Sequence, residues 1–289
     1  MPQRPFELLD LDGLLNEEQK LIRDTVRQYV DDRIRPEIAD WFERGELPAK
    51  ELALEMGEIG LLGMHLEGYE CAGTDAISYG LANLELEAGD SGIRSLVSVQ
   101  GSLAMYAIHQ WGSEEQKREW LPRMARGEVI GCFGLTEPDF GSNPAGMRTF
   151  AKRDGPLSCL TEARFGIIWG VLGAARDCLE TAIDYSISRI QFDRPIGGFQ
   201  LTQRKLAEMS VSLDTGYLLA HRIGTLKDAG QVRPEMISVG KFNNAKAAID
   251  IARECRSILG GNGVTLEYPI IRHANNLVCG FLLENTHEI

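Results

Sequence analysis

The sequence is short of basic residues. Lysine and arginine together number 30, against 42 aspartates and glutamates, so the 289-residue chain carries a formal net charge of -12 at pH 7. An acidic chain is repelled by the phosphates of nucleic acids and by anionic lipid surfaces. We therefore expect neither nucleic acid nor a membrane among its partners, although a local basic pocket remains compatible with this charge.

Long apolar runs are also missing. The longest stretch without a charged side chain, Ser95 to Ser113, could cross a bilayer by its length, but it carries Ser98, Gln100 and His109. Polar side chains at that density disfavour a transmembrane helix. We interpret this stretch as a buried helix of a globular protein.

Cysteine is sparse and scattered. The six cysteines form neither a CxxC pair nor a cluster with histidine, which argues against a zinc site and against a disulfide scaffold. They are Cys71, Cys132, Cys159, Cys178, Cys255 and Cys279. The N-terminal segment contains Glu7, Asp10 and Asp12, whereas signal and transit peptides avoid acidic residues. We expect reduced thiols and a cytoplasmic location.

What the chain does contain is apolar residues at helical spacing. With 44% hydrophobic and 25% charged residues, its composition is that of a globular protein, and its length suggests about two domains. Asn16 with Gln19, and Ser113 with Gln116, match the capping box that opens a helix, and Pro36 should interrupt the first helix. The remaining N-terminal helices are predicted over Ala49–Gly57, Ala76–Ala88 and Gly92–His109. Residues 1–128 should thus form a helical domain.

The helical pattern then stops and resumes. A short run of small and β-prone residues, Val129–Gly134, predicts a strand, and Glu137–Gly146 reads as a loop. Residues 156–289 should form a helical bundle with helices over Thr161–Arg189, Leu201–Gly230, Pro234–Leu259 and Tyr268–Val278. The expected fold class is all-α, with two helical parts joined by the short β segment 129–155.

The loop after the predicted strand carries a motif. Hydroxyl groups and glycines there suit contacts of backbone N–H groups with a phosphate or a ring carbonyl, although an ordinary loop explains the composition equally well. The motif reads Leu135-Thr136-Glu137-Pro138, then Gly141-Ser142 and Asn143. It resembles the LTEPxxGSD motif of the acyl-CoA dehydrogenases, with asparagine where aspartate is usual. The resemblance extends over the chain through Arg189-Ile190-Gln191-Phe192, Gln200 and Gly260-Gly261-Asn262-Gly263.

Within that family the chain is most similar to the members that act on glutaryl-CoA. The residues that carry this likeness are Glu87, Arg94-Ser95, Gly131-Cys132-Phe133-Gly134, Arg164-Phe165-Gly166-Ile167 and Trp169-Gly170. The resemblance implies that Glu87, Arg94 and Ser95 bind the substrate and that Arg94 pairs with its distal carboxylate, which a guanidinium does well. A lone arginine would more simply cap a helix or lie in solvent.

The resemblance also implies a cofactor and partners. FAD would be bound by Leu135 and Thr136 at the flavin ring, Ser142 at the pyrophosphate, and Arg189, Phe192 and Gln200 at the adenine end across a subunit interface. Gly260, Gly261 and Thr286 complete the implied cofactor site, and Arg164 would lie along the path of CoA. The implied partners are an acyl-CoA substrate, an electron-transfer flavoprotein and further copies of the chain in a tetramer. In isolation, Phe192 reads as a core residue and Arg189 as a solvated helix end.

The implied catalytic base is Glu284. A carboxylate can remove the acidic α-proton of a thioester while the β-hydride passes to a flavin. The family motif usually reads Tyr-Glu-Gly-Thr, but this chain has Leu283-Glu284-Asn285-Thr286. The alternative is a solvated glutamate near the C-terminus.

The largest departure from the family is a missing segment. The family's middle β-domain follows the LTEP loop, whereas here Lys152-Arg153-Asp154-Gly155 continues directly into the C-terminal helices, and the final helices that follow the base motif are missing after Ile289. We expect weakened FAD binding and impaired oxidative decarboxylation of glutaryl-CoA to crotonyl-CoA. The alternatives are a catalytically silent helical protein that binds acyl-CoA or oligomerises, and a dehydrogenase of another short acyl-CoA.

Overall fold

The computed structural model describes residues 4–140, 146–148 and 159–282, with only the backbone of residues 159–160 and 279–282. Helices dominate it, and the all-α class predicted from the sequence is confirmed. In the described part of the chain, strands form only two short antiparallel hairpins, β1–β2 (Glu67–Gly68 with Cys71–Ala72) and β3–β4 (Ile190–Gln191 with Arg194–Pro195).

Backbone contacts divide the chain into two compact units. The first unit comprises Met1–Leu47, Asp75–Arg94 and Phe165–Gly280, and the second comprises Pro48–Thr74, Ser95–Arg164 and Phe281–Ile289. Each unit is therefore assembled from stretches that are distant in the sequence. The division into segments 1–128, 129–155 and 156–289 stays a prediction.

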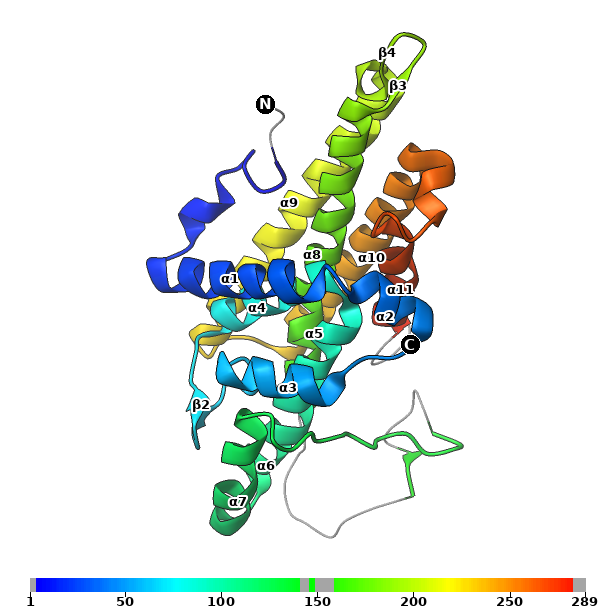
Figure 1. Cartoon of the computed structure of the whole chain (residues 1–289). Coiled ribbons are helices and arrows are strands. Elements are labelled where there is room, and N and C mark those ends of the chain that lie inside the picture. The colour runs from blue at the N-terminus through cyan, green and yellow to red at the C-terminus, as the bar shows by residue number, and fades with distance from the viewer. Residues whose placement is uncertain (1–3, 141–145, 149–158, 283–289) are drawn as a thin grey trace. The chain divides into compact units, whose positions relative to one another are not determined.

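Three long helices form the centre of the first unit. They are α8 (Cys159–Ser188), which leads into the hairpin β3–β4, α9 (Gln200–Asp228) and α10 (Pro234–Leu259) (Figure 1). The side-chain amide of Asn244, fully buried on α10, donates to the carbonyl oxygens of Ile168 on α8, over 2.9 Å, and of Gly216 on α9, over 3.1 Å. Because a buried amide without partners is costly, this residue fixes the register of all three helices.

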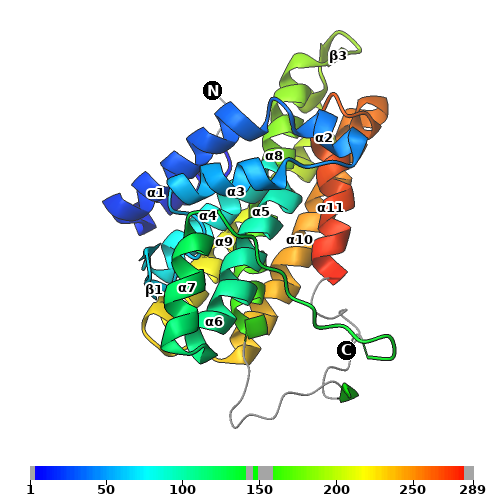
Figure 2. The ribbon, with the colours of Figure 1, turned by 60° about the horizontal axis from the view of Figure 1, so that its bottom comes forward.

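Helix α4 (Ala76–Gly89) packs within the first unit, and every one of its residues is buried. Its first turn is capped by Asp75, whose carboxylate accepts from the Ser78 N–H over 2.6 Å. A Cβ at Gly80 would overlap the indole of Trp169, so the backbone of α4 passes directly over that ring on α8. Helix α11 (Ile270–Leu282) is labelled in Figure 2. It also contacts α8, because the His273 ring lies 2.9 Å from Asp177 Oδ2.

The N-terminal helices of the first unit follow the sequence pattern. The predicted capping box of Asn16 and Gln19 opens α1 (Glu17–Tyr29), with both reciprocal hydrogen bonds present. Helix α1 packs on α4 and continues as the π-helical turn η2 (Val30–Ile34). The predicted break occurs at Pro36, and α2 (Ile38–Arg44) begins after it.

The second unit contains α3 (Ala49–Glu58), the π-helical η3 (Val99–Met105), α6 (Tyr106–Trp111) and α7 (Glu114–Ala125). The predicted capping box of Ser113 and Gln116 opens α7. A small core forms around Leu66, Met105 and Leu121, all nearly inaccessible to solvent. The helix predicted over Gly92–His109 is present as the unbroken helical run of α5 (Ser91–Ser98), η3 and α6, with π-helical geometry in its middle.

The strand predicted over Val129–Gly134 is wrong. This segment has no regular structure. The nearest β pairing is an isolated bridge between Glu137 and Phe140, which follow the segment. Gln100 replaces a neighbouring strand: its amide donates to the Val129 carbonyl over 2.8 Å, and its side-chain oxygen accepts from the Gly131 N–H over 2.7 Å. A strand needs hydrogen-bond partners for its backbone groups along its whole length. In the described residues, the Gln100 side chain supplies such partners only to Val129 and Gly131.

Candidate functional site: a buried ion pair and a cationic cavity

A buried ion pair connects the end of α4 with the start of α5. At Asp90, between the two helices, the backbone is extended (φ -165°, ψ 145°), and the chain turns there. This turn brings the guanidinium of Arg94 beside the carboxylate of Glu87, with Arg94 Nε donating to Glu87 Oε2 over 2.6 Å. The two side chains are only 3% and 0% exposed. The structure therefore brings together two of the three substrate-binding residues predicted around this turn.

Ser91 completes the cluster in the first unit. Its hydroxyl donates to Glu87 Oε1 over 2.9 Å, so the two carboxylate oxygens of Glu87 have different donors. Removing both charges from water is expensive, and only close geometry with additional hydrogen bonds compensates that cost. A guanidinium binds carboxylates by charge-assisted hydrogen bonds, and Arg94 binds Glu87 in this way through its Nε.

Two further buried acids of the first unit, Glu85 and Asp177, have a structural role. Glu85, on α4, accepts two hydrogen bonds of 2.7 Å from Arg176 and is also contacted by Arg27. Burial alone would raise its pKa, but the two guanidinium groups outweigh burial and lower the pKa to about 2. Likewise, burial opposes the charged form of Asp177, yet His273 and Arg35 hold the pKa of Asp177 well below its usual range. These acids, which are ionised at neutral pH, tie α1, α4, α8 and α11 together.

A cavity of about 420 Å³ lies at the C-terminal end of α8, against the junction of α10 and η6 (Gly260–Val264). Its lining includes the predicted cofactor residues Arg189, Gly260 and Gly261. A Cβ at Gly261 would meet no atom within 4 Å, so the backbone there faces open space. A cation beside exposed backbone suits a phosphate group.

Two neighbours of this cavity were missed by sequence reasoning. Asn262 donates to the Tyr185 hydroxyl over 3.1 Å, and both residues line the cavity. The signal for Asn262 was available, because it stands inside the Gly260–Gly263 motif. Tyr185 precedes Arg189 by one helical turn, so the period of α8 could have indicated it.

Two predicted cofactor residues lie outside the lining of this cavity. Phe192 is 87% exposed at the tip of the hairpin, in a left-handed backbone conformation (φ 51°). Gln200 is the exposed first residue of α9. Neither residue is among those that line the cavity beside Arg189.

The loop residues belong to the second unit. Leu135 is half-buried and Thr136 is exposed. Glu137 anchors the far side of the loop, where its carboxylate accepts from the Arg148 N–H over 2.9 Å. Within the described residues, Glu137 is thus the motif residue whose side chain accepts from a backbone N–H.

The remaining predicted residues are placed as follows. Ser95 is half-buried on α5, and Arg164 is half-buried on α8. Ser142, Glu284 and Thr286 lie outside the described residues. Any role of these three stays a prediction.

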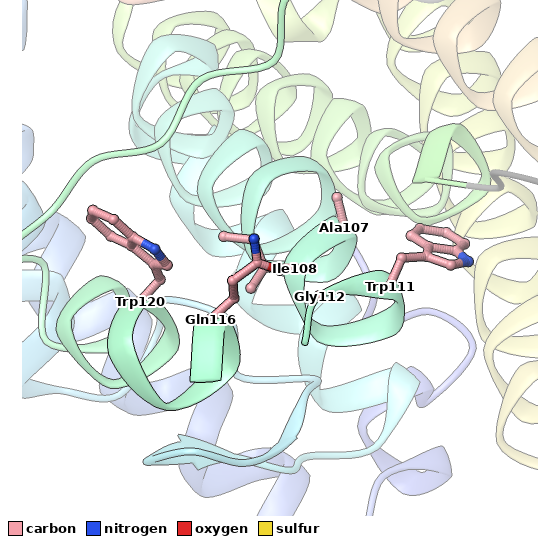
Figure 3. A pocket seen from close by; sticks show the side chains of 6 residues that line it. All are labelled: Ala107, Ile108, Trp111, Gly112, Gln116 and Trp120. Atoms are coloured by element: carbon pink, nitrogen blue, oxygen red, sulfur yellow. The ribbon is translucent and has the colours of Figure 1, made fainter. Parts of the chain in front are cut away.

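A second cavity, of about 480 Å³, lies between α6 and α7 in the second unit. Trp111 and Trp120 lie on either side of Ile108 and Gln116 (Figure 3), and no titratable group lines it. It therefore offers apolar contact but no acid, base or nucleophile. Across the described ranges, no cluster of three potential metal ligands occurs, and no helix is long and apolar enough to cross a membrane.

Comparison with known proteins identifies the family. Residues 16–128 match the N-terminal domain of acyl-CoA dehydrogenases, and residues 156–288 match their C-terminal domain. The family's middle domain is absent from these matches, which leave residues 129–155 between them.

The matched proteins cover nearly the whole chain. The crystal structure of glutaryl-CoA dehydrogenase from Mycobacterium smegmatis is 49% identical, with a TM-score of 0.95 over 99% of this chain and 96% of that one. A structure of a glutaryl-CoA dehydrogenase from the same organism in complex with FADH2 matches to the same extent. The short-chain specific acyl-CoA dehydrogenase of Bos taurus is 25% identical over 365 residues, covering 95% of this chain and 88% of the relative. That aligned length exceeds the 289 residues of this chain, so the alignment contains gaps in this chain opposite residues of the relative. The chain belongs to the acyl-CoA dehydrogenase family, whose members are FAD-dependent oxidoreductases.

Proposed function

We propose that this chain acts on glutaryl-CoA, by oxidative decarboxylation to crotonyl-CoA. The observation that carries the proposal is the buried Glu87–Arg94 pair, with Ser91 on the second oxygen of Glu87. A fully buried cation serves little purpose in a site for purely hydrocarbon acyl chains, because its desolvation is costly. The 49% identity to a protein named glutaryl-CoA dehydrogenase supports the same substrate.

In this proposal Arg94 recognises the distal carboxylate of the acyl chain. Glu87, itself held by Ser91, fixes the guanidinium in orientation before substrate arrives, so the pairing requires little reorganisation. The substrate carboxylate accepts charge-assisted hydrogen bonds from the Arg94 guanidinium. Ser95, the next residue on α5, contributes a hydroxyl, and Arg164 contacts CoA.

Glu284 is proposed as the general base that removes the α-proton of the thioester. A carboxylate performs this step well when burial raises its pKa toward neutrality. Leu283 and Asn285 replace the tyrosine and glycine usual beside this base in the family. We therefore propose that the base is less well placed than in its relatives, and that turnover is reduced.

The cavity residues of the first unit fit the nucleotide end of FAD. Arg189 supplies a cation for a phosphate, and the bare backbone at Gly260 and Gly261 allows close approach. When bound, FAD accepts the β-hydride of the substrate. We assign the remaining contacts to Leu135, Thr136, Ser142, Phe192, Gln200 and Thr286.

Exposed apolar side chains support contacts between copies of the chain. Phe192 is 87% exposed, Leu201 77% and Ile190 52%, all at or beside the hairpin β3–β4. Burial of such side chains favours association, and we propose a homotetramer in which this hairpin completes the FAD site of another copy. We further propose a cytoplasmic location, with an electron-transfer flavoprotein as the electron acceptor.

The deciding experiment compares two substrates. Arg94→Ala should lower kcat/KM for glutaryl-CoA by at least about thirtyfold and for butyryl-CoA by less than about threefold, because only the dicarboxylic substrate loses a charge pair. Arg253→Ala, on an exposed face of α10, serves as the control for loss of an arginine. Equal losses on both substrates would refute the assignment. A purified protein that folds but binds no FAD and shows no turnover would favour the catalytically silent alternative.

A further inference from the structure

A glycine on α8 faces the Glu87–Arg94 pair. A Cβ built at Gly170 would overlap Glu87 Oε2 and would lie 3.1 Å from Glu87 Cδ and 3.2 Å from Arg94 Nε. The flanking residues Trp169 and Val171 are both 0% exposed, so the helix has no free side toward which it could move. The space that a side chain at position 170 would need is occupied by the ion pair.

The other glycines of α8 in the first unit have different neighbours. A Cβ at Gly173 would overlap the carbonyl oxygen of Leu84, so that glycine is required for the close approach of two helix backbones. A Cβ at Gly166 would lie 3.3 Å from the nearest atoms, which are side-chain atoms of Tyr79 and Asn83. At Gly170 alone among these three, the atoms in the way belong to the charged side chains of the proposed site.

We infer that Gly170 is a specificity-determining residue: by having no side chain, it leaves the volume in which Glu87 orients Arg94. The inference rests on the proposed function for its substrate, a dicarboxylic acyl-CoA. A methyl group at position 170 would force the Glu87 carboxylate to rotate away from Arg94 Nε, because residues 165–179 of α8 are all buried. The guanidinium would then lose its preset orientation, while a monocarboxylic acyl chain has no carboxylate to lose.

The first test measures binding. In the FAD-supplemented full chain, Gly170→Ala should weaken glutaryl-CoA binding about tenfold or more by calorimetry, and butyryl-CoA binding less than about threefold. Gly166→Ala is the matched control on the same helix and should change neither affinity beyond threefold. Equal weakening of both ligands, or no weakening of either, would overturn the role in specificity.

The second test measures the steric coupling without any substrate. Gly170→Ala should lower the unfolding midpoint by about 5 °C in the wild-type background, but much less in a Glu87→Ala background, where the obstructing carboxylate is absent. Additive shifts would show that Gly170 is required for helix packing alone, and would overturn the inference. If the coupling is found but wild-type protein does not prefer glutaryl-CoA over butyryl-CoA, the proposed substrate fails while the steric relationship stands.

Discussion

Arg272 on α11 donates through Nη1 to Asp90 Oδ2 over 2.7 Å, although the two residues stand 182 positions apart in the sequence. The same nitrogen donates to the carbonyl oxygen of Gly89 over 2.7 Å, and Asn276 donates to Asp90 Oδ2 over 2.8 Å. The other oxygen of Asp90 accepts from the Gly92 N–H at the start of α5. One carboxylate thus connects the C-terminal helix to the turn that positions Arg94.

We expect Asp90→Asn to lower the free energy of unfolding by about 3 kcal/mol or more, because it leaves the Arg272 cation buried without its counterion. Urea unfolding measures this loss. Asp250→Asn, which breaks the exposed pair with Lys246, is the control and should cost less than about 1 kcal/mol. Similar losses of unfolding free energy in the two variants would mean that the buried Asp90–Arg272 pair stabilises the fold no more than an exposed pair does.

Glu85 should make stability depend on acid pH. Its pKa is about 2 in the folded protein, whereas the ordinary value for a glutamate is 4.5. Between pH 2 and pH 4.5 the folded state therefore binds fewer protons than the unfolded state. The stabilisation, of order 3 kcal/mol, is present above pH ~4.5 and is lost as the pH falls through about 2. The advantage of wild type over Glu85→Gln in urea unfolding should therefore shrink as the pH is lowered below ~4.5. The exposed Glu17→Gln serves as the control, and a constant advantage at all pH values would contradict the prediction.

Filling the cavity beside Arg189 should weaken FAD binding without loss of stability. Gly261→Val adds a side chain where no protein atom lies within 4 Å, so we expect an unchanged unfolding midpoint and an FAD dissociation constant raised about tenfold or more. Flavin fluorescence titration measures the constant. Arg189→Ala should also raise the FAD dissociation constant. Arg204 is an exposed arginine on α9 that pairs with Glu208, so Arg204→Ala should leave the constant unchanged. An unchanged constant for Gly261→Val would place the cofactor elsewhere.

We also expect wild-type protein to bind FAD more weakly than a relative that retains the middle domain, by about two to four decades. The physical reason is the loss of hydrogen bonds and apolar contacts that the missing domain would supply to the flavin. Dialysis of both proteins, followed by flavin absorbance, tests this expectation. Retention of one FAD per chain after extensive dialysis would contradict it.

The helices and their ends could be read from the sequence, because caps and apolar periods are local. The capping boxes at Asn16 and Ser113 and the break at Pro36 appear in the structure where the pattern placed them. Glu87 and Arg94 were found only through resemblance to a family. Their spacing of seven residues would place them on one face of a continuous helix, but the extended residue Asp90 separates two helices between them.

Only the tertiary structure shows which residues far apart in the sequence contact each other, and which segments have no partner strand. The segment Val129–Gly134 has the composition of a strand, yet it has no partner strand and is held by the side chain of Gln100. Gly170 stands 76 positions from Arg94, and nothing in its neighbourhood in the sequence shows that a methyl group there would strike Glu87. Local periodicity and capping are set by residues within one or two turns, so the sequence by itself determined the helices and the family. Ion pairs, steric room and strand pairing depend on which surfaces meet after folding, and only the packed chain determines them.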